Sequence, residues 1–356
     1  MTTKKLPWDI PTSWRPALEA AGRGAAMFLI GEIDSGKSTL AAALANEAAA
    51  AGRRTAIVDA DVGQSSIGPP ACVGMAIPAG GFESLDDLVP HRIDFVGACS
   101  PAGHLLQAAT STAVLVGAAR SAGCETIVVD TTGMVSGGLA RALKVAKIRL
   151  VDPDVIVALQ SEDEVEHLVA AYRTRRRPQV LRLRTSRAAR LRSREERVAN
   201  RQRKFAAYFR EAKLIDISWA DAPMENSPWT TGEPAPGHIA AYAEECVGCE
   251  VLYVERRADG AVLVVRGRPE AEGLRALRES LGGTPHVIDA ASLESLVVGL
   301  LGDQGETLAI GIMERVDFRK RRVSVYTPLG EAALVRGMRL GSVRIARDGT
   351  QLGTGE

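Results

Sequence analysis

Short apolar runs separated by longer helix-like stretches dominate the first 220 residues. Each run has the length of a buried strand, and the runs cover residues 25–30, 55–58, 91–97, 126–129, 155–159 and 179–183. Stretches between them, such as 40–51 and 105–122, are rich in Ala and Leu, which favour helix. Uninterrupted apolar strands that alternate with helices are typical of a mostly parallel sheet flanked by helices. The pattern therefore predicts an α/β domain.

The pattern changes after a stretch rich in proline and glycine at residues 221–238. Beyond it, short strands are predicted at 251–255, 262–266, 286–288, 307–313, 322–326 and 341–345. Helices are predicted there only at 270–281 and 291–300. We therefore expect four regions, which are a lead-in at 1–24, an α/β domain at 25–220 whose sheet is closed by a strand at 214–219, a linker at 221–238 and a smaller β-rich domain at 239–356.

One segment between the first apolar run and the first Ala-rich stretch matches G-x-x-x-x-G-K-S/T at every fixed position. Its residues are Gly31, Glu32, Ile33, Asp34, Ser35, Gly36, Lys37, Ser38 and Thr39. Strand, glycine loop and helix in this order form a phosphate cradle, because backbone N–H groups and the helix N-terminus point at the phosphates. We expect Lys37 to neutralise phosphate charge and the Ser38 hydroxyl to bind Mg²⁺. The segment predicts a nucleoside triphosphate site of the P-loop type.

Acidic residues end two of the predicted strands, at the edge where ligands bind in open α/β sheets. Asp59 and Asp61 end the second strand, and Asp130 ends the fourth. All three are candidates to hold Mg²⁺, directly or through water. Residues two apart on a strand point to the same face unless the strand has ended between them, and Asp61 stands at the strand's end. One of Asp59 and Asp61 is therefore expected to face the metal while the other anchors the loop. Asp61, nearer the strand's end, is the candidate acceptor of a substrate proton, and two solvated acids in a turn are the structural alternative.

A Ser-Pro-Ala-Gly-His loop follows the predicted strand at 91–97. Its hydroxyl and imidazole, on Ser100 and His104, are candidates to contact phosphate or substrate, whereas a lone histidine is more often structural. The strand at 155–159 leads into Gln160-Ser161-Glu162-Asp163, which lacks the lysine of an N/T-K-x-D guanine reader. We therefore expect ATP rather than GTP.

Residues 173–213 contain sixteen Lys and Arg but three Asp and Glu, a local charge of +13 in a chain of net charge +1. Helix-compatible spacing over about 186–212 joins Arg187, Arg190, Arg192, Arg194, Arg197, Arg201, Arg203, Lys204 and Arg210. A row of guanidinium groups can stabilise a transferring phosphoryl group and bind a polyanion. A solvated charged face is the alternative, but such a helix repels itself without an anion. We expect an arginine-rich lid.

Composition limits the remaining classes of function. The chain has no run of 18 apolar residues and no apolar core of a signal peptide at its start, so we expect a cytoplasmic protein with no membrane contact. Five cysteines fit a reducing compartment better than a disulfide framework. Cys246 and Cys249 form a single C-x-x-C without the second pair of a zinc ribbon, so no metal other than Mg²⁺ is predicted.

These residues together resemble the P-loop polynucleotide 5′-hydroxyl kinases. That family includes the kinase subunit of the eukaryotic pre-mRNA cleavage complex, its archaeal relatives and the nucleolar kinase of ribosomal RNA processing. Two features are specific: Asp59-Ala60-Asp61-Val62-Gly63-Gln64 is similar to the family's D-x-D-x-G-Q, and Arg192-Ser193 with Arg197 and Arg201 is similar to its arginine lid. The likeness covers residues 8–220 well and the C-terminal domain more loosely, through 302–311.

The resemblance implies a role for each matching residue. Asp61 would activate the 5′-hydroxyl, Arg192 and Arg197 would reach over the phosphates, and Gln64 and Arg201 would lie on the substrate side. Thr131, Thr132, Gly133 and Met134 look like the family's T-x-G-W clasp, with methionine where the stacking tryptophan would be. Because stacking on an aromatic ring is worth about 1–3 kcal/mol per base, Met134 is expected to loosen the grip on the first nucleotide.

The sequence thus predicts transfer of the γ-phosphate of ATP, with Mg²⁺, to the 5′-hydroxyl of RNA or DNA. Two alternatives stay open. One is an ATP-binding scaffold or switch in an RNA-processing assembly with little or no kinase activity, and the other is a kinase acting on a smaller hydroxyl compound. Binding that weakens steeply with salt would indicate a polyanion site. The sequence points to no particular protein partner.

Overall fold

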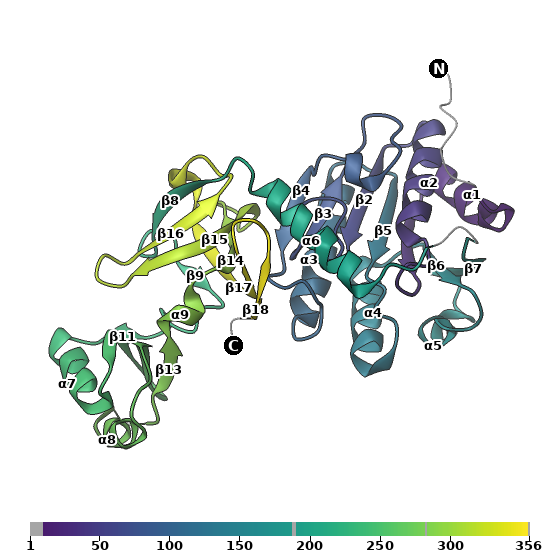
Figure 1. The fold of residues 1–356 in the computed structure, drawn as a ribbon. Coiled ribbons are helices and arrows are strands. Elements are labelled where there is room, and N and C mark those ends of the chain that lie inside the picture. The colour runs from purple at the N-terminus through teal and green to yellow at the C-terminus, as the bar shows by residue number, and fades with distance from the viewer. Residues whose placement is uncertain (1–9, 187–189, 282, 355–356) are drawn as a thin grey trace. The chain divides into compact units, whose positions relative to one another are not determined.

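The structure, a computed structural model, describes residues 10–186, 190–281 and 283–354. The chain forms two compact units, residues 1–205 and 206–356, and each is described by itself (Figure 1). The expected lead-in contains α1 (Arg15–Arg23), while residues 1–9 lie outside the described residues, as does Arg187 of the expected lid. The first unit ends inside the expected lid, within helix α6 (Arg194–Tyr208).

The first unit is built on one sheet with the strand order β4–β3–β2–β5–β1–β6–β7. Its strands are β1 (Ala26–Ile30), β2 (Thr55–Ala60), β3 (Cys72–Ala76), β4 (Arg92–Phe95), β5 (Thr126–Thr131), β6 (Val155–Gln160) and β7 (Gln179–Arg184). Pairing is parallel from β2 across to β7 and antiparallel where β3 joins β2 and β4. Strands β1, β2, β5 and β6 are buried along their whole length, which confirms the expected mostly parallel sheet.

Helices cover both faces of this sheet. They are α1, α2 (Lys37–Ala50), α3 (Leu105–Ser121), α4 (Gly137–Val151) and α5 (Glu166–Val169), with 3-10 turns at Thr12–Trp14, Leu85–Asp87 and Ala170–Tyr172. Met27 and Leu29 of β1 pack in one core cluster with α1 and α2. Phe28 and Ile30 point the other way, into a second cluster with α3 and α4. Alternate residues of one central strand therefore supply two cores, as a doubly covered sheet requires.

Strand β3 is the part of this sheet that the sequence pattern does not predict. It is short, and Gly74 interrupts its apolar run. A Cβ at Gly74 would lie 1.8 Å from the carbonyl oxygen of Ile67, so the glycine lets the loop that follows β2 pass directly over the strand. Close backbone approach, rather than strand propensity, explains this residue.

The second unit contains two sheets. The larger has the order β18–β17–β14–β15–β16–β8, all antiparallel, with β9 added in parallel beside β17. Its strands are β8 (Lys213–Ser218), β9 (Met224–Glu225), β14 (Leu296–Leu301), β15 (Thr307–Asp317), β16 (Arg322–Thr327), β17 (Gly337–Ile345) and β18 (Gln351–Thr354), with a 3-10 turn at Ala332–Leu334.

The smaller sheet has the order β10–β11–β12–β13. It comprises β10 (Glu233–Pro234), β11 (Glu250–Arg257), β12 (Gly260–Arg266) and β13 (His286–Asp289), and the helices of this part are α7 (Gly237–Val247), α8 (Ala271–Leu281) and α9 (Ala290–Leu293). Val247, Leu263 and Leu277 share one core cluster, so α7 and α8 pack on this sheet. The expected β-rich C-terminal region is confirmed.

Two expected elements are wrong. The strand at 214–219 does not close the first sheet, because β8 pairs antiparallel with β16 and buries Ile217 in the core of the second unit. The helix expected at 291–300 ends at Leu293, and β14 begins at Leu296. Ser295, between them, has φ 67°, which a continuing helix does not allow. The buried, Val-rich run that follows pairs with β15 and β17 instead.

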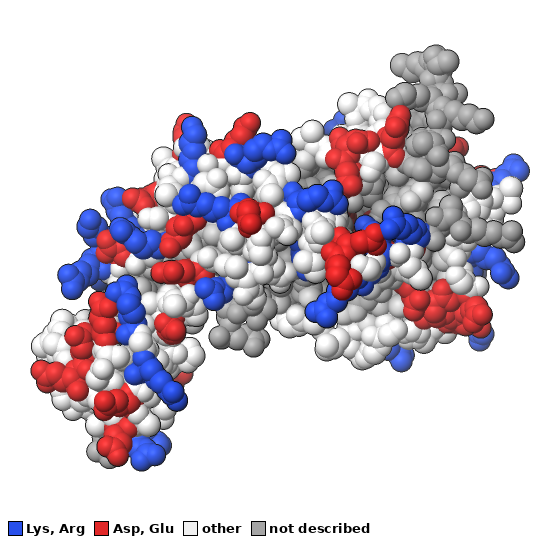
Figure 2. All heavy atoms as spheres, viewed as in Figure 1, with Lys and Arg blue, Asp and Glu red and all other residues white. Residues whose placement is uncertain are grey.

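Charged side chains of both signs are interspersed over the face seen in Figure 2. Among the described residues, no helix combines the length and apolar character that crossing a membrane would need.

We predict that Gly74→Ala destabilises the first unit, because the new Cβ would collide with the Ile67 backbone. The expected loss in the free energy of unfolding is about 2–4 kcal/mol, measured by urea denaturation. Gly117→Ala in α3 is the matched control, since a Cβ there meets nothing within 4 Å, and it should be neutral or stabilise by up to about 1 kcal/mol. Equal stability of the two variants would contradict this account of β3.

Candidate active site

The P-loop segment follows the buried strand β1, and its last three residues, Lys37–Thr39, begin α2. A Cβ at Gly31 would lie 2.7 Å from the Leu159 carbonyl oxygen, and Gly36 has φ 93°, so both positions require glycine. The Lys37 ammonium group folds back over the loop, where it donates hydrogen bonds to the Glu32 carbonyl oxygen and to Ser35 Oγ (3.3 Å). Burial lowers the pKa of Lys37, and Asp130, Asp61 and Asp34 oppose that shift. The loop is thus shaped as the sequence predicts.

Ser38 and Asp130 meet beside the P-loop. The Ser38 hydroxyl donates to Asp130 Oδ2 over 2.6 Å. The other oxygen, Asp130 Oδ1, is buried and has no hydrogen-bond partner among the described residues. Burial raises the pKa of Asp130, while the nearby Lys37 lowers it. A hydroxyl and an unsatisfied carboxylate oxygen suit a hard cation such as Mg²⁺, which binds few protein ligands and takes the rest from water and phosphate.

Asp59 holds the loop after β2. Its Oδ1 accepts a hydrogen bond from the Asp61 N–H (3.0 Å), and its Oδ2 accepts from the N–H groups of Ile67 (3.1 Å) and Ser66. Burial, with repulsion from Asp130 and Asp61, raises the pKa of Asp59 to about 7. Both oxygens of Asp59 thus have backbone partners in the loop, and the expected role of Asp59 in holding a metal stays a prediction. Among the described residues no cluster of three or more acidic, His or Cys side chains is arranged for a metal.

Asp61 is half-buried, directly after the end of β2. Its Oδ1 accepts hydrogen bonds from the N–H groups of Gly63 and Gln64, each 3.1 Å long. A carboxylate fixed by the backbone keeps its position. This one lies near Lys37, where its negative charge opposes the lowering of the Lys37 pKa by burial. Of the two acids, Asp59 lies within β2 and is held by the backbone of the loop, whereas Asp61 lies just beyond the strand's end and near Lys37.

The arginine-rich lid begins ahead of its helix. Ser193 and Glu196 form a capping box, in which the Glu196 N–H donates to Ser193 Oγ (3.1 Å) and the Ser193 N–H donates to Glu196 Oε2 (2.8 Å). Helix α6 therefore starts at Arg194, so Arg190 lies ahead of the helix and does not share a helical face with Arg194, Arg197 and Arg201, which corrects the expected row.

Asp34 of the P-loop binds the start of the lid. Its side chain is 2% exposed, and its oxygens accept hydrogen bonds from the Arg192 N–H (2.8 Å) and Arg192 Nε (2.9 Å). Arg197 lies 3.5 Å from the same carboxylate and donates to the Arg192 carbonyl oxygen over 2.6 Å. Both predicted lid arginines are thus brought to the P-loop. Asp34, expected only as part of the phosphate loop, joins the loop to the lid.

Gln64 makes a second connection to the lid. Its Nε2 donates to the Arg197 carbonyl oxygen (3.1 Å), and its Oε1 accepts from Asn200 Nδ2 (3.1 Å). Burial raises the pKa of the Cys99 thiol to about 12, and Arg201, one turn further along α6, opposes that shift. The loop that carries Asp61 and the lid therefore share direct hydrogen bonds.

The predicted clasp lies against the P-loop. A Cβ at Gly133 would lie 2.5 Å from the Ile33 nitrogen, so these backbones approach closely. The Thr131 hydroxyl donates to the Leu29 carbonyl oxygen (2.7 Å), and Thr132 Oγ1 is 3.4 Å from the Met134 nitrogen. Met134 packs against the core on the α3–α4 side. The structure therefore brings the clasp to the phosphate site and gives its hydroxyls structural partners.

The loop with Ser100 and His104 lies beside the Asp61 turn, since a Cβ at Gly63 would be 2.7 Å from the Cys99 carbonyl oxygen. Ser100 Oγ accepts from the Ala102 N–H (3.2 Å). His104 precedes α3, and partial burial lowers its pKa. The loop that carries both residues therefore lies next to the turn that carries Asp61.

Two buried lysines of α4 are the site residues that the sequence reasoning missed. Lys144 donates to Thr131 Oγ1 and to the Thr132 carbonyl oxygen, each over 2.6 Å, and Lys147 donates to the Ala60 carbonyl oxygen over 3.3 Å. Both side chains are fully buried, and burial lowers both pKa values, that of Lys147 to about 8. Asp61 opposes each shift. Their three-residue spacing, on the face that carries Ala140 and Leu143, was the available signal.

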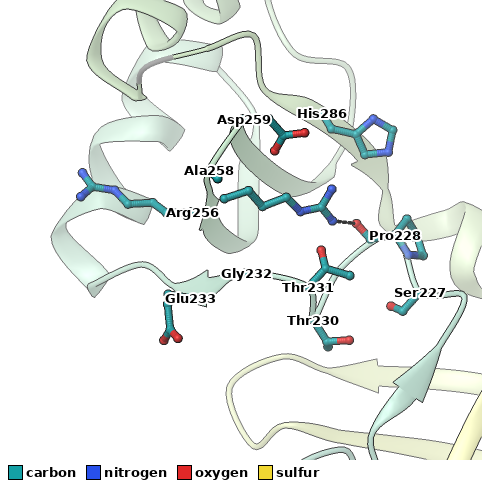
Figure 3. Close-up of a pocket in the computed structure, with 11 residues that line it drawn as sticks. Ser227, Pro228, Thr230, Thr231, Gly232, Glu233, Arg256, Ala258, Asp259 and His286 are labelled. Carbon is teal, nitrogen blue, oxygen red and sulfur yellow. Dashed lines mark hydrogen bonds between the residues drawn. The ribbon is translucent and has the colours of Figure 1, made fainter.

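A separate cavity of about 1170 Å³ lies in the second unit (Figure 3). Its lining contains the cationic residues Arg256 and Arg257 and the anionic residues Glu233 and Asp259, and Arg257 donates to the Pro228 carbonyl oxygen. It contains none of the residues predicted for phosphate chemistry, so we assign the candidate site to the P-loop of the first unit.

The chain matches known proteins along most of its length. Residues 31–211 match the family model described as mRNA cleavage and polyadenylation factor CLP1 P-loop. A polyribonucleotide 5′-hydroxyl-kinase of Pyrococcus furiosus is 31% identical, covering 98% of this chain and 96% of that protein. One of Methanocaldococcus jannaschii is 32% identical, covering 92% and 89%. A solved complex of Clp1p with Pcf11p has a TM-score of 0.56 at 11% identity, covering 93% of this chain and 78% of that one, and supports the fold alone.

We predict that Asp34→Ala releases the start of the lid, because Arg192 loses two hydrogen bonds to a buried carboxylate. Each charge-assisted bond is worth about 1.5–3 kcal/mol, so trypsin cleavage after Arg190, Arg192 and Arg194 should speed up about tenfold or more. Asp86→Ala is the matched control, because Asp86 forms an ion pair with Lys204 of helix α6 but its side chain is 58% exposed. Unchanged cleavage in Asp34→Ala would contradict the contact.

Lys147 provides a test of the buried charges by pH. Its folded-state pKa of about 8 is below its ordinary 10.5, so the penalty of burying its charge is complete below pH 8 and is relieved as pH rises to 10.5. The free energy of unfolding of the wild type should therefore gain up to about 3 kcal/mol over that of Lys147→Met across this range. The exposed Lys213→Met is the control, and parallel pH curves for wild type and Lys147→Met would contradict the assignment.

Proposed function

Because the chain belongs to the CLP1 P-loop family, we propose that it transfers the γ-phosphate of ATP, in the presence of Mg²⁺, to the 5′-hydroxyl of RNA. It is a polynucleotide 5′-hydroxyl kinase, and hence a phosphotransferase, as its archaeal relatives are named. The observation that carries the assignment of roles is the position of Asp61, a carboxylate fixed by the backbone at the open side of a lysine-rich phosphate site.

The donor nucleotide would bind at the P-loop. The N–H groups of residues 31–38 and the start of α2 supply donors and a positive dipole to the phosphates. Lys37 would exchange its bonds to Glu32 and Ser35 for phosphate oxygens. Ser38 and Asp130 would hold Mg²⁺, which neutralises charge on the phosphate oxygens when bound.

The transfer step needs a base for the attacking oxygen. The Asp61 carboxylate would accept the proton of the 5′-hydroxyl as that oxygen forms its bond to the γ-phosphorus, and ADP would leave. Lys37, Arg192 and Arg197 would stabilise the negative charge that spreads over the transferring group. Arg192 binds Asp34 through Nε and its backbone N–H, and its two terminal nitrogens have no hydrogen-bond partner among the described residues, so they could bind phosphate.

RNA is the proposed substrate because the relatives carry the name polyribonucleotide kinases. The clasp Thr131–Met134, Gln64 and the loop with Ser100 and His104 would contact the first nucleotides. Met134 offers a softer surface than tryptophan, so we expect tight binding to depend on phosphates further along the strand.

We predict that Asp61→Asn lowers transfer of labelled γ-phosphate from ATP to a 5′-hydroxyl RNA oligonucleotide by about 10²–10⁴-fold. Lys37→Ala should abolish transfer, and Arg197→Ala should mainly lower turnover. The same RNA with a 5′-phosphate is the substrate control, and the exposed Asp163→Asn is the protein control.

Full activity of Asp61→Asn would overturn the assignment of the base. ATP binding without any label on RNA, DNA or small hydroxyl compounds would favour the alternative of a nucleotide-binding scaffold. The ratio of label on RNA to label on matched DNA tests the proposed substrate.

A further inference from the structure

The turn between β15 and β16 carries four consecutive cationic residues, Arg319, Lys320, Arg321 and Arg322, all of them exposed. We call residues 319–322 the basic turn. It lies outside the arginine-rich lid and in the other compact unit. In the region of this hairpin, which Figure 1 locates by its strand labels, Figure 2 shows basic side chains with acidic ones between them. Nothing in the phosphate chemistry of the P-loop uses these residues.

The basic turn is held in place by aromatic packing. Phe318, the residue before it, is 8% exposed. Its ring lies 5.9 Å from that of Trp219, 6.1 Å from that of Trp229 and 5.5 Å from that of Tyr253. Rings at these separations pack as strongly as core aromatics do. The cations are therefore presented by a fixed support and are not a loose tail.

Backbone hydrogen bonds fix the turn from both sides. The Lys320 N–H donates to Asp317 Oδ1 (2.9 Å), and the Trp219 N–H donates to the Arg321 carbonyl oxygen (3.1 Å). Arg321 has φ 54°, a conformation that non-glycine residues seldom adopt without such support. A sequence selected only for turn formation would place glycine or asparagine there.

Asp317 is the acidic neighbour of the basic turn, and its pKa is lowered by the Lys320 N–H and by the charges of Lys320 and Arg315. Among the described residues the ion pairs of this hairpin are Arg315 with Asp317, at 4.0 Å, and Arg347 with Glu314, at 2.8 Å. Neither uses a residue of the basic turn. Like charges placed side by side repel each other, and a bound polyanion relieves that repulsion by replacing diffuse counterions.

From this placement we propose that the basic turn binds the phosphodiester backbone of the RNA substrate, at nucleotides beyond those held in the active site. The proposal rests on the proposed function for the identity of the polyanion. Three of the four cations are arginines, whose planar group pairs with phosphate through two parallel hydrogen bonds. RNA is favoured over an acidic protein segment because a row of neighbouring cations matches a row of phosphates without requiring a particular sequence.

The surface beside the turn is hollowed. Pro228 and Thr230, which flank Trp229, line the cavity of Figure 3, and its wall also contains Arg256 and His286. Since Trp229 packs on Phe318, the cavity adjoins the base of the basic turn. A strand bound at the turn would have room to pass along this polar wall.

The test compares a triple charge reversal with a matched reversal elsewhere in the same unit. The test variant is Arg319→Glu, Lys320→Glu and Arg322→Glu, which leaves Arg321 and the aromatic support intact. The control is Arg268→Glu, Arg275→Glu and Arg278→Glu, three exposed arginines outside the hairpin. Fluorescence anisotropy measures binding of labelled oligouridylates, one four nucleotides long and one of about thirty, in the full-length protein.

We expect the test variant to bind the long RNA about tenfold or more weakly at 0.1 M salt, with the slope of log K against log salt reduced by about 2, because three phosphate contacts are lost at about 0.7 each. Binding of the four-nucleotide RNA should stay unchanged, as should kcat on it, and the control should behave as wild type. Equal long-RNA affinity in wild type and test variant would overturn the proposal and leave the turn to an acidic protein segment.

An equal loss in the control would also overturn the proposal, by showing a general effect of charge. Because anisotropy measures binding without catalysis, the result stands apart from the transfer assay. A protein that binds long RNA through the turn but transfers no phosphate would refute the proposed function and keep this surface.

Discussion

The first unit depends on one constraint, which is that several charged side chains are buried near the carboxyl ends of β2 and β5. Asp59, Asp130, Lys37, Lys144 and Lys147 are all buried there. A buried ion without partners costs several kcal/mol, so each must have an opposite charge or hydrogen bonds close by. The backbone of the Asp61–Ile67 loop satisfies Asp59, the clasp satisfies Lys144, and Ser38 meets Asp130. Asp61, beside this group, is half-buried, and it is the acid that we propose meets the substrate.

The lid belongs to the same arrangement because the P-loop and the loop that carries Asp61 both bind it. Asp34 holds Arg192 from one side, and Gln64 holds the Arg197 backbone from the other. A displacement of either loop would therefore move the arginines that are proposed to stabilise the transferring group. Preorganised donors of this kind need little rearrangement at the moment of reaction, which is why the geometry favours catalysis over simple nucleotide storage.

Local signals made much of the site predictable. The P-loop needs glycines at set positions, and Asp59, Asp61 and Asp130 end apolar strands, so motif and strand pattern located them correctly. Lys144 and Lys147 escaped because a lysine on a helix normally faces solvent, and only its tertiary partners keep it buried. The start of α6 at Arg194 depends on a capping box whose Ser193-x-x-Glu196 pattern is local and was available.

The fold was less predictable where strands join across long sequence separations. Strand β8 is apolar enough to belong to a sheet, but its sequence does not show which of the sheets it joins. Its partner β16 lies about a hundred residues further along the chain. At Ser295 a single backbone angle separates a short helix from a buried strand, and serine carries no strong signal for it. Propensity gave way in both places to the burial of Ile217, Val298 and their neighbours in one core.

A crystal structure of the protein with a non-hydrolysable ATP analogue, Mg²⁺ and a 5′-hydroxyl RNA oligonucleotide tests the central claim most directly. The quantity to measure is the distance between the Asp61 carboxylate and the terminal 5′-oxygen. We expect hydrogen-bond contact, at about 2.6–3.2 Å, with that oxygen facing the γ-phosphate. A 5′-oxygen held by another residue, or an Asp61 that points away from it, would contradict the account.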